Sequence, residues 1–557
     1  MQQPVSGRQV SVLGHSFQPS TLQKRSGKGT TKNRLNPVAR IGYICEMLLR
    51  GGRCGSGRST MLSSLLLFAL LLLVVLLGTK RAFSKKLRLP PSPPKLPLLG
   101  HLLQLGSLPH RSLSALSKKH GPLMLLHFGR IPTLVVSSAD MAQEVMRTHD
   151  TSFASRPDLK PVRTILYDNH DVGFAPYGDY WRYTRKLCTI HLLSGKRVKS
   201  YRDVRQEEVG FMMQKISRAS LSSTSGFIDM SKVINSFVTD IVGRVVSGTS
   251  FRAADRCQLF SRLIDDNGVA FRELCVEELF PSFGFLDGIL GLNPTARKVA
   301  VEWDAALDEM IQDHVERPDR DEVRERDFVD ELLAVVDKPE KEFCLTMQQM
   351  KAILWDMFSA GVEATFTALE WGMAELVRHP AALKKLQEEV RGLAAGKDMV
   401  KEDETQDMVY MKAVLKEVLR MHPPTPLLLP RESIEDCQIQ GYHIPKKTRV
   451  LINAWAISRD PRHWEAPEEF RPERFISSDL DFKGKDFDFT PFGSGRRICP
   501  GMQLAVATLE LALANLVHQF DWELPLGMTI DEFDMTESPG LTARKKEPLH
   551  LVAKPLE

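Results

Sequence analysis

The sequence predicts one large, mainly α-helical domain with a minor β part, preceded by an N-terminal transmembrane anchor. Helical patterns dominate residues 110–420, and no internal repeat or long linker divides the chain after residue 100. An uncharged apolar run precedes this region, at 61–78. Short β-type runs stand at Leu123–Phe128, Thr133–Ser137, 430–470 and 535–555. These runs are too few to make strands more than a minor part of the fold.

Composition is typical of a globular protein and argues against several kinds of site. Of 557 residues, 43% are hydrophobic and 26% are charged, as expected for a sizeable core. Net charge is +5, but the signs nearly balance after residue 90, so no nucleic-acid surface is indicated. The eight cysteines are scattered and form no C-x-x-C pair. This usage indicates neither a zinc site nor a disulfide framework, and it favours a reducing, cytosol-facing compartment.

The chain before the apolar run is predicted to be a disordered, basic leader over residues 1–60. It is rich in Ser, Thr, Gly and Arg, and holds ten Lys or Arg residues against one acid, Glu46. An organelle transit peptide has a similar composition. The favoured interpretation is a mis-assigned start, with Met61 as the true first residue, because the apolar run begins there.

The apolar run predicts a single-pass anchor over 61–79. Eighteen uncharged residues are at the short end of what crosses a hydrocarbon core of about 30 Å. The run is followed by the basic residues Lys80, Arg81, Lys85, Lys86 and Arg88, which favours a cytosolic position for the domain. A cleaved signal peptide is the alternative, but no small-x-small cleavage site follows.

A basic and proline-rich hinge is predicted over 80–100, with the catalytic domain at 101–557. Five prolines fall within eight residues of the hinge. Proline fixes φ and lacks a backbone donor, so we expect a stiff, extended spacer there.

The longest predicted helix begins after Thr346 and ends before Pro380. Thr346–Gln349 has the form of a capping box, and about 32 residues without proline follow, or about 48 Å of helix. Its middle reads Ala360-Gly-Val-Glu-Ala-Thr365, and small residues beside an acid are unusual in a plain core helix.

The most specific signal is the pattern F-x-x-G-x-R-x-C-x-G, formed by Phe492, Gly495, Arg497, Cys499 and Gly501. A lone cysteine is ordinarily a small buried hydrophobe. Here the glycines allow backbone to approach a flat cofactor and turn amides toward the sulfur, and such hydrogen bonds tune a metal-bound thiolate. A helix expected to start near Met502 adds its positive end.

On this signature the chain resembles the cytochrome P450 superfamily, most closely its plant microsomal members, with the family's order of motifs over 61–557. The resemblance implies the cytochrome P450 fold and haem b, with Cys499 as axial ligand of the iron. It also implies a monooxygenase that inserts one atom of O₂ into a hydrophobic small molecule of plant specialised metabolism. A thiolate ligand favours O–O cleavage.

Two further groups of residues match the family. Trp181 and Arg185 fit W-x-x-x-R, which implies contact with a haem propionate, and Arg431 and Arg497 are further propionate candidates, since arginine offers carboxylates a bidentate fork. The structural network implied around the haem is formed by Glu417 and Arg420 of E-x-x-R and Arg474 of P-E-R-F.

The long helix departs from the family pattern, Ala/Gly-Gly-x-Asp/Glu-Thr-Thr/Ser. The implied proton-delivering acid is Glu363, but Ala364 replaces the first threonine and Thr365 lies about 100° further around the helix. The favoured interpretation is hydroxylation with protons from ordered water or a substrate hydroxyl. The alternatives are Thr365 acting through a helix distorted at Gly361, or a haem-thiolate isomerase or dehydratase that needs neither O₂ nor a reductase.

Partners and location follow from the same resemblance. The chain lacks the common nicotinamide, flavin and P-loop fingerprints, so electrons must come from outside. NADPH–cytochrome P450 reductase is the implied donor, docking on a cationic face near Cys499, and cytochrome b5 is a second candidate partner. The expected location is the endoplasmic reticulum membrane, with the plastid as the less favoured alternative. A non-enzymatic haem carrier or sensor is disfavoured.

The substrate pocket is implied to be apolar and to suit a membrane-partitioned molecule. By family position, its lining comes from Leu159–Phe174, Val269–Phe285, Phe358–Phe366, Thr425–Leu429 and Pro539–Leu541. Phe358, Val362 and Leu427–Leu429 are the expected contacts, whereas Phe366, Leu428 and Leu541 fit a core role equally well.

Overall fold

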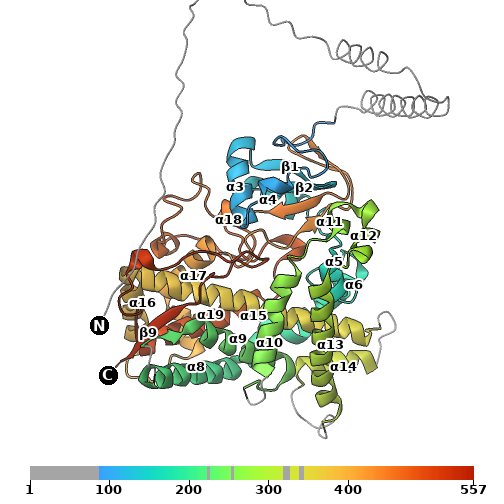
Figure 1. Ribbon diagram of the computed structural model, residues 1–557. Helices are drawn as coiled ribbons and strands as arrows, with labels where there is room; N and C mark the ends of the chain where they lie inside the picture. The colour runs from blue at the N-terminus through green and yellow to red at the C-terminus, as the bar shows by residue number, and fades with distance from the viewer. Residues whose placement is uncertain (1–86, 223–225, 253–255, 318–325, 338–343, 557) are drawn as a thin grey trace, which may run out of the picture. The chain divides into compact units, whose positions relative to one another are not determined.

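Helices form most of the protein, as predicted, in a computed structural model that describes residues 87–222, 226–252, 256–317, 326–337 and 344–556 (Figure 1). The predicted leader and anchor, and residues 80–86 of the hinge, lie outside the described residues. Within the described ranges, every helix is too short or too polar to cross a membrane.

The α-helices follow one another along the chain with short connections. The N-terminal half contains α3 (Pro109–His120), α4 (Ala139–Gln143), α5 (Lys160–Ile165), α6 (Asp179–Cys188), α7 (Gly195–Ser200), α8 (Arg202–Ser222), α9 (Met230–Ser247), α10 (Arg256–Ala270), α11 (Val276–Leu279) and α12 (Phe285–Ile289). The C-terminal half contains α13 (Pro294–Val315), α14 (Phe328–Asp337), α15 (Met347–Arg378), α16 (Pro380–Leu393), α17 (Val409–Met421), α18 (Ala454–Ile457) and α19 (Met502–Gln519).

The strands form three small sheets. The largest has the order β1 (Leu123–Phe128), β2 (Ile131–Val136), β7 (Arg449–Ile452), β4 (Arg431–Glu432). The second has the order β3 (Ile228–Asp229), β9 (His550–Pro555), β8 (Phe520–Glu523), and the third pairs β5 (Cys437–Ile439) with β6 (Tyr442–Ile444). In the first sheet β2 runs antiparallel to β1 and parallel to β7, with Leu134 opposite Val450. The first predicted strand has the observed bounds, and the second begins two residues earlier than predicted.

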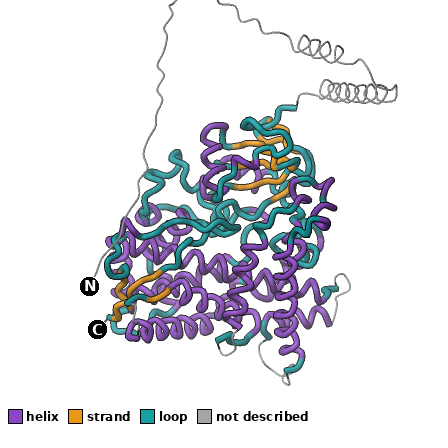
Figure 2. The backbone as a smooth tube through the Cα atoms, in the orientation of Figure 1, coloured by secondary structure: helices purple, strands orange, loops and turns teal. Residues whose placement is uncertain are grey.

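The long helix α15 runs through the middle of the helical layer, between α9 and the pair α17 and α19 (Figure 2). It spans the predicted 32 residues. Its capping box is also confirmed, because Gln349 N donates to Thr346 Oγ1 at 3.3 Å and Thr346 N donates to Gln349 Oε1 at 2.9 Å. Buried aromatic side chains on α15, such as Phe358 and Trp371, belong to the main hydrophobic core.

The proline-rich segment contains no helix over 87–100, but it lies against the domain. Leu125 N donates to Pro91 O at 2.9 Å, and His443 N donates to Arg88 O at 2.7 Å. The folded unit therefore begins at Leu87, and residues 87–100 are part of the body instead of a free spacer.

Candidate cofactor site

Cys499 lies in the loop that leads into α19, and its surroundings fit a ligand thiolate. Cys499 N donates to Phe492 O at 2.9 Å, which closes the loop. The residue is partly accessible. Burial by neighbouring atoms raises the pKa of the Cys499 thiol, while the backbone N–H groups of Gly501 and Met502 and the charge of Arg185 oppose the rise. The sulfur thus meets the two amides that were expected to stabilise its ionised form.

The glycines of this loop have different roles. A Cβ on Gly501 would lie 4.0 Å from Cys499 Sγ, so the small residue keeps backbone close to the sulfur. Gly495 has φ +70°, and a Cβ there would lie 2.2 Å from Met146 O. The sequence led us to expect that such glycines approach the cofactor. At Gly495 the close approach is instead to the chain around Met146, where Arg496 N also donates to Asp150 Oδ2 at 3.0 Å.

Four arginines gather behind this loop, and three of them were predicted: Arg185, Arg431 and Arg497. Arg497 Nε donates to Ala154 O at 2.7 Å and its Nη2 to Ala175 O at 2.6 Å. Arg431 Nη2 donates to Ser494 O at 2.9 Å. Arg185 Nη2 donates to Ile498 O, next to Cys499. The motifs of α6, β4 and the cysteine loop therefore meet in space.

The fourth member, Arg156, was not predicted. Its Nε donates to Gly173 O at 2.8 Å and its Nη1 to Leu429 O at 2.8 Å and Pro430 O at 2.9 Å. The side chain lies in a loop before α5 and carries no motif in a single sequence. We name these four residues (Arg156, Arg185, Arg431 and Arg497) the arginine cluster.

The arginine cluster has a deficit of negative partners. Within the described ranges, the ion pair that reaches it joins Arg431 Nη1 to Asp150 Oδ1 at 3.5 Å. Desolvation lowers the pKa of Arg431 to about 10. The pKa of Arg497 is lowered to about 9, mainly by desolvation and secondly by repulsion from Arg431. Buried cations under mutual repulsion are stabilised by an anion, and arginine suits carboxylates. The cluster therefore fits a group that carries two carboxylates, as haem does.

Trp181 contacts the arginine cluster by its ring. Its Nε1 donates to Val172 O at 3.1 Å, so this N–H is engaged by the protein. The guanidinium carbon of Arg497 lies 4.2 Å from the Trp181 ring centroid, within cation–π range. Trp181 thus supports an arginine of the cluster, and its own contact with a propionate stays a prediction.

The middle of α15 presents an accessible strip in which three of the four residues are small. Met357, Ala360, Gly361 and Ala364 are partly accessible or exposed, while most of the helix is buried. Their spacing places them on one helical face. Thr365 is buried, 6% exposed, and α15 is an uninterrupted α-helix across Gly361. The alternative in which a local distortion brings Thr365 into the place of Ala364 is therefore wrong for this structure.

Glu363 contacts residues that the motif search missed. Thr542 Oγ1 donates to Glu363 Oε1, and Arg544 Nη2 lies 3.2 Å from the same oxygen. Arg544 Nη1 in turn donates to the exposed Asp265 at 2.5 Å. Burial raises the pKa of Glu363, whereas Arg544 and Thr542 oppose the rise. Glu363 is thus a partly buried acid with a polar connection to the surface. No sequence signal links it to Thr542, because about 180 residues separate them.

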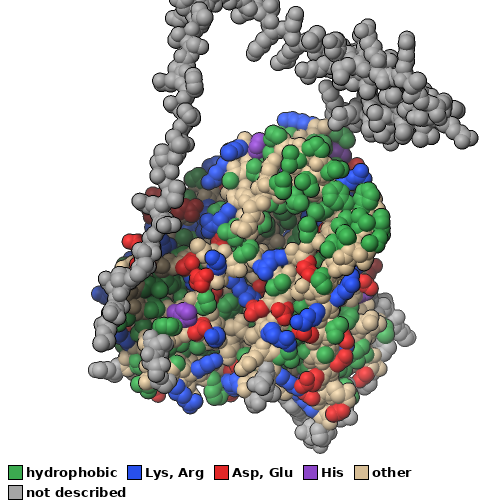
Figure 3. Space-filling view, in the orientation of Figure 1, with side chains coloured by type: hydrophobic (Ala, Val, Ile, Leu, Met, Phe, Trp, Pro, Cys, Tyr) green, Lys and Arg blue, Asp and Glu red, His purple; other side chains and the backbone are tan. Residues whose placement is uncertain are grey.

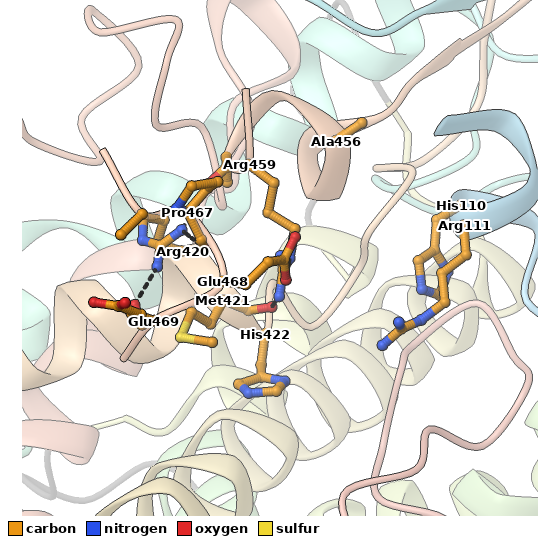
Figure 4. A network of polar contacts seen from close by, with 12 residues as sticks. His110, Arg111, Arg420, Met421, His422, Ala456, Arg459, Pro467, Glu468 and Glu469 are labelled. Carbon is orange, nitrogen blue, oxygen red and sulfur yellow. Dashed lines mark hydrogen bonds and ion pairs between the residues drawn. The ribbon is translucent and has the colours of Figure 1, made fainter. Parts of the chain in front are cut away.

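The predicted structural network of Glu417, Arg420 and Arg474 is present as direct hydrogen bonds. Glu417 Oε2 accepts from Arg420 Nε at 2.7 Å, and Glu417 Oε1 accepts from Arg474 Nε at 3.0 Å. Arg420 also donates to Pro467 O at 2.8 Å and to Glu469 O at 3.2 Å (Figure 4). These bonds fix α17 to the chain that precedes the cysteine loop.

The predicted pocket residues divide into two groups. Leu427, Leu428, Leu429 and Leu541 are partly accessible. Phe358 and Val362 are completely buried, and the Phe358 ring packs 4.7 Å from that of Phe260. Phe358 and Val362 therefore belong to the core in this structure, which corrects their assignment as lining.

Comparisons with known proteins agree with this geometry. The family model described as "Cytochrome P450" matches residues 90–552. Cytochrome P450 736A117 of Prunus mume is 44% identical over 88% of this chain and 95% of its own length. Cytochrome P450 71A4 of Solanum melongena is 44% identical over 89% and 98%. Phenylacetaldehyde oxime monooxygenase CYP71AN24 of Prunus mume is 43% identical over 85% and 90%.

The fold is also found among solved structures. A zebrafish cytochrome P450 determined with abiraterone has a TM-score of 0.67 and 26% identity, covering 81% of this chain and all of that one. A second structure, with progesterone, has the same TM-score and identity and covers 80% of this chain.

Proposed function

The chain belongs to the cytochrome P450 family as a plant monooxygenase with haem b as cofactor and O₂ as co-substrate, and on this premise we propose roles for its residues and a class of substrate. Cys499 would bind the haem iron through its thiolate, and the arginine cluster would hold the two propionates. The observation that carries this assignment is the buried, under-neutralised cluster beside a thiol that meets two backbone amides. When bound, the haem supplies O₂ binding and O–O bond cleavage.

Residues of this chain stabilise the thiolate, leave space beside α15 and deliver protons. The amides of Gly501 and Met502 hold charge on Cys499 Sγ, and Arg185 adds a nearby positive charge. Ala360 and Ala364 leave room beside α15. Glu363 lies next to that strip in the sequence of α15, burial raises its pKa toward the range of a proton donor, and Arg544 and Asp265 connect it to solvent. Because Ala364 has no hydroxyl, ordered water or a substrate hydroxyl carries the proton at this position.

Thr542→Val is expected to shift the pH dependence of turnover to higher pH and to reduce product formed per NADPH. The hydroxyl donates to Glu363 and favours its ionised form, so its loss raises the pKa of Glu363 further. Glu363→Gln is expected to lower turnover by about 100-fold or more, the usual scale of a general acid. The measurement is product and NADPH consumption across pH. Thr365→Val is the matched control, and an effect as large as that of Thr542→Val would contradict this assignment.

The proposed substrate is a hydrophobic small molecule of plant specialised metabolism. Leu427, Leu428, Leu429 and Leu541 are partly accessible and supply apolar surface, which suits a hydrophobic ligand. One relative is named as acting on phenylacetaldehyde oxime, a small aromatic compound. That compound and similar aromatic oximes are therefore the first substrates to test.

The proposed electron donor is NADPH–cytochrome P450 reductase, with cytochrome b5 as a second partner. Support comes from exposed basic residues close to the cysteine loop, namely Arg182 and Lys186 of α6 and Arg496. The guanidinium carbons of Arg182 and Arg496 lie 5.5 Å and 5.9 Å from the same Tyr177 ring. A cationic surface at this place favours docking of an acidic electron donor.

The proposed location is the endoplasmic reticulum membrane, with the domain on the cytosolic face. Exposed apolar side chains gather around the β1–β2 end and α12, as Figure 3 shows for the upper part of the domain. The most exposed are Leu98, Leu103, Phe285, Ile289 and Leu290. The two parts of this surface are joined, because Gly129 N donates to Leu99 O and Arg130 N donates to Leu279 O. An apolar patch near the start of the folded unit is suited to a membrane surface.

One experiment tests activity and location together. The full chain is expressed in yeast with and without a plant reductase, and alkaline-washed microsomes are assayed with phenylacetaldehyde oxime and a panel of apolar aromatics. We expect the protein in the membrane pellet, with product formation that requires NADPH, O₂ and reductase. Product without NADPH or O₂ would favour the isomerase or dehydratase alternative that Ala364 suggests. Protein in the supernatant would contradict the anchor.

A further inference from the structure

Two buried carboxyl groups lie behind the arginine cluster, outside the residues that the proposed function uses. Asp171 is 0% exposed and precedes α6, and Asp356 is 6% exposed and lies on α15. The chain between Asp171 and Ala175, which we name the 171–175 turn, connects them to the cluster. Asp171 Oδ2 accepts from Phe174 N at 2.6 Å and closes this turn. Asp356 Oδ2 accepts from Val172 N at 2.6 Å and from Gly173 N at 3.0 Å.

The carbonyl oxygens of the same turn accept hydrogen bonds from the cofactor residues. Val172 O accepts from Trp181 Nε1 at 3.1 Å and from Arg497 Nη1 at 3.3 Å. Gly173 O accepts from Arg156 Nε at 2.8 Å, and Ala175 O accepts from Arg497 Nη2 at 2.6 Å. The turn therefore has three N–H groups held by carboxyls and three C=O groups that accept from Trp181 or from arginines of the cluster.

We propose that Asp171 and Asp356 are positioning residues that fix the 171–175 turn and, through its carbonyl oxygens, aim Arg156 and Arg497 at the carboxylates of the cofactor. The inference rests on the proposed haem site. It adds a connection from the long helix α15 to that site, because Asp356 is one helical turn before Ala360. Outer groups that orient ligand-binding side chains commonly contribute 10- to 100-fold to affinity or activity.

The two buried carboxyl groups lie close together, and burial, together with the charge of Asp171, disfavours ionisation of Asp356 by raising its pKa. Their oxygens face the same side of Gly173, where a Cβ would lie 3.2 Å from Asp356 Oδ1 and 3.3 Å from Asp171 Oδ2. Burial raises the pKa of Asp171 to about 6. The pKa of Asp356 is raised well above its usual range, mainly by burial and secondly by the charge of Asp171. Of the two carboxyls, Asp356 therefore has the pKa that is raised by both burial and a neighbouring negative charge.

One remaining negative charge suits the arginine cluster. It lies near Arg156 and Arg497, whose charged forms Asp171 favours. Two negative charges would neutralise these two arginines and weaken their attraction for an external carboxylate. The other titratable groups near the pair are Tyr180 and Cys188, and burial raises the pKa of each above the neutral range.

Gly173 permits the two carboxyls to approach the turn together. A Cβ at this position would lie 3.2 Å from Asp356 Oδ1 and 3.3 Å from Asp171 Oδ2. Both separations are tighter than ordinary contacts, so a side chain would push at least one carboxyl away. The close approach of the two carboxyls therefore explains why the turn has a glycine at position 173.

The test compares Asp356→Asn with Asp356→Ala in the full-length holoenzyme. Asparagine keeps an oxygen for Val172 N and Gly173 N and replaces the protonated oxygen by an N–H donor, whereas alanine removes both. The readout is the rate at which haem transfers to an excess of apomyoglobin, followed by absorbance from pH 6.5 to 9.5. We expect Asp356→Ala to release haem about 10- to 100-fold faster than the unmodified protein. Asp356→Asn should release it at nearly the unmodified rate at neutral pH.

The pH profile separates positioning from general loss of stability. A carboxyl with a raised pKa stabilises the folded site below that pKa, and this stabilisation is lost as pH rises through it. Haem release from the unmodified protein should therefore accelerate at high pH, and Asp356→Asn, which cannot ionise, should lose this acceleration. Asp240→Asn is the matched control, since Asp240 is a buried acid on α9 whose pKa burial raises to about 6. It should keep the unmodified profile.

Two results would overturn the inference. One is an Asp356→Asn profile equal to that of the unmodified protein across the whole pH range. The other is an Asp356→Ala release rate no faster than that of Asp240→Ala. If Asp356→Ala does not fold, the asparagine profile decides alone. Failure of the unmodified protein to bind haem through a thiolate would instead contradict the proposed function.

Discussion

Replacing Cys499 with serine is expected to abolish monooxygenase turnover and to remove the spectroscopic signature of thiolate-bound haem. A serine hydroxyl is a weaker donor than a thiolate and does not supply the electron density that favours O–O cleavage. The amides of Gly501 and Met502 would then face a neutral group. The measurement is the carbon monoxide difference spectrum of the reduced protein, together with turnover. We expect the red-shifted band of thiolate-ligated haem to be absent and activity to fall below detection.

The matched control is Cys437→Ser, because Cys437 of β5 is also partly buried but lies away from the cysteine loop. It should retain the red-shifted band and most of the activity. Cys499→His separates loss of ligation from loss of the thiolate, since histidine also binds haem iron. Its band should move to the position of histidine-ligated haem. A red-shifted band in either Cys499 variant would contradict the assignment of this residue as the ligand.

Glu417→Ala is expected to destabilise the domain by about 3–5 kcal/mol, the usual cost of leaving a buried charge without its partner. Glu417 and Arg420 are both completely buried, with Arg420 Nε 2.7 Å from Glu417 Oε2. The substitution also leaves Arg474 Nε and Arg471 N without their shared acceptor. Haem incorporation should fall with stability, because this network supports the chain before the cysteine loop. The measurement is the free energy of unfolding from urea denaturation, followed by fluorescence.

Glu473→Ala provides the control, because Glu473 makes an ion pair with Lys385 in which both side chains are largely exposed. Pairs of this kind contribute about 0–1 kcal/mol. Equal losses of stability in Glu417→Ala and Glu473→Ala would show that the buried network does not support the fold.

The features that the sequence predicted well are those encoded by local pattern. A capping box and an uninterrupted run without proline defined α15, since helix ends depend on residues within one turn. The cysteine loop was identified from ten consecutive positions, and the structure places the amides of Gly501 and Met502 at the sulfur. Glu417 and Arg420 were found for the same reason, because residues three apart share a helical face.

Family motifs extended this prediction to several distant residues. Arg185 and Arg474 were found because each belongs to a recognisable short pattern, and Arg431 was a further candidate for the propionates. The structure then placed them together around the cysteine loop and α17. Position in a motif did not reveal how each side chain would be used. Trp181 donates its N–H to Val172 O, and Gly495 accommodates Met146 O.

Only the tertiary structure revealed contacts between unmarked residues that lie far apart in the chain. Arg156 joins the arginine cluster through bonds to residues 17 and 273 positions away. Thr542 contacts Glu363 across 179 residues, and the carboxyls of Asp171 and Asp356 hold the same turn. Packing likewise decided that Phe358 faces the core. A local pattern fixes backbone conformation and the face on which a side chain lies. Which distant group meets that face depends on how helices pack, and therefore on the whole folded chain.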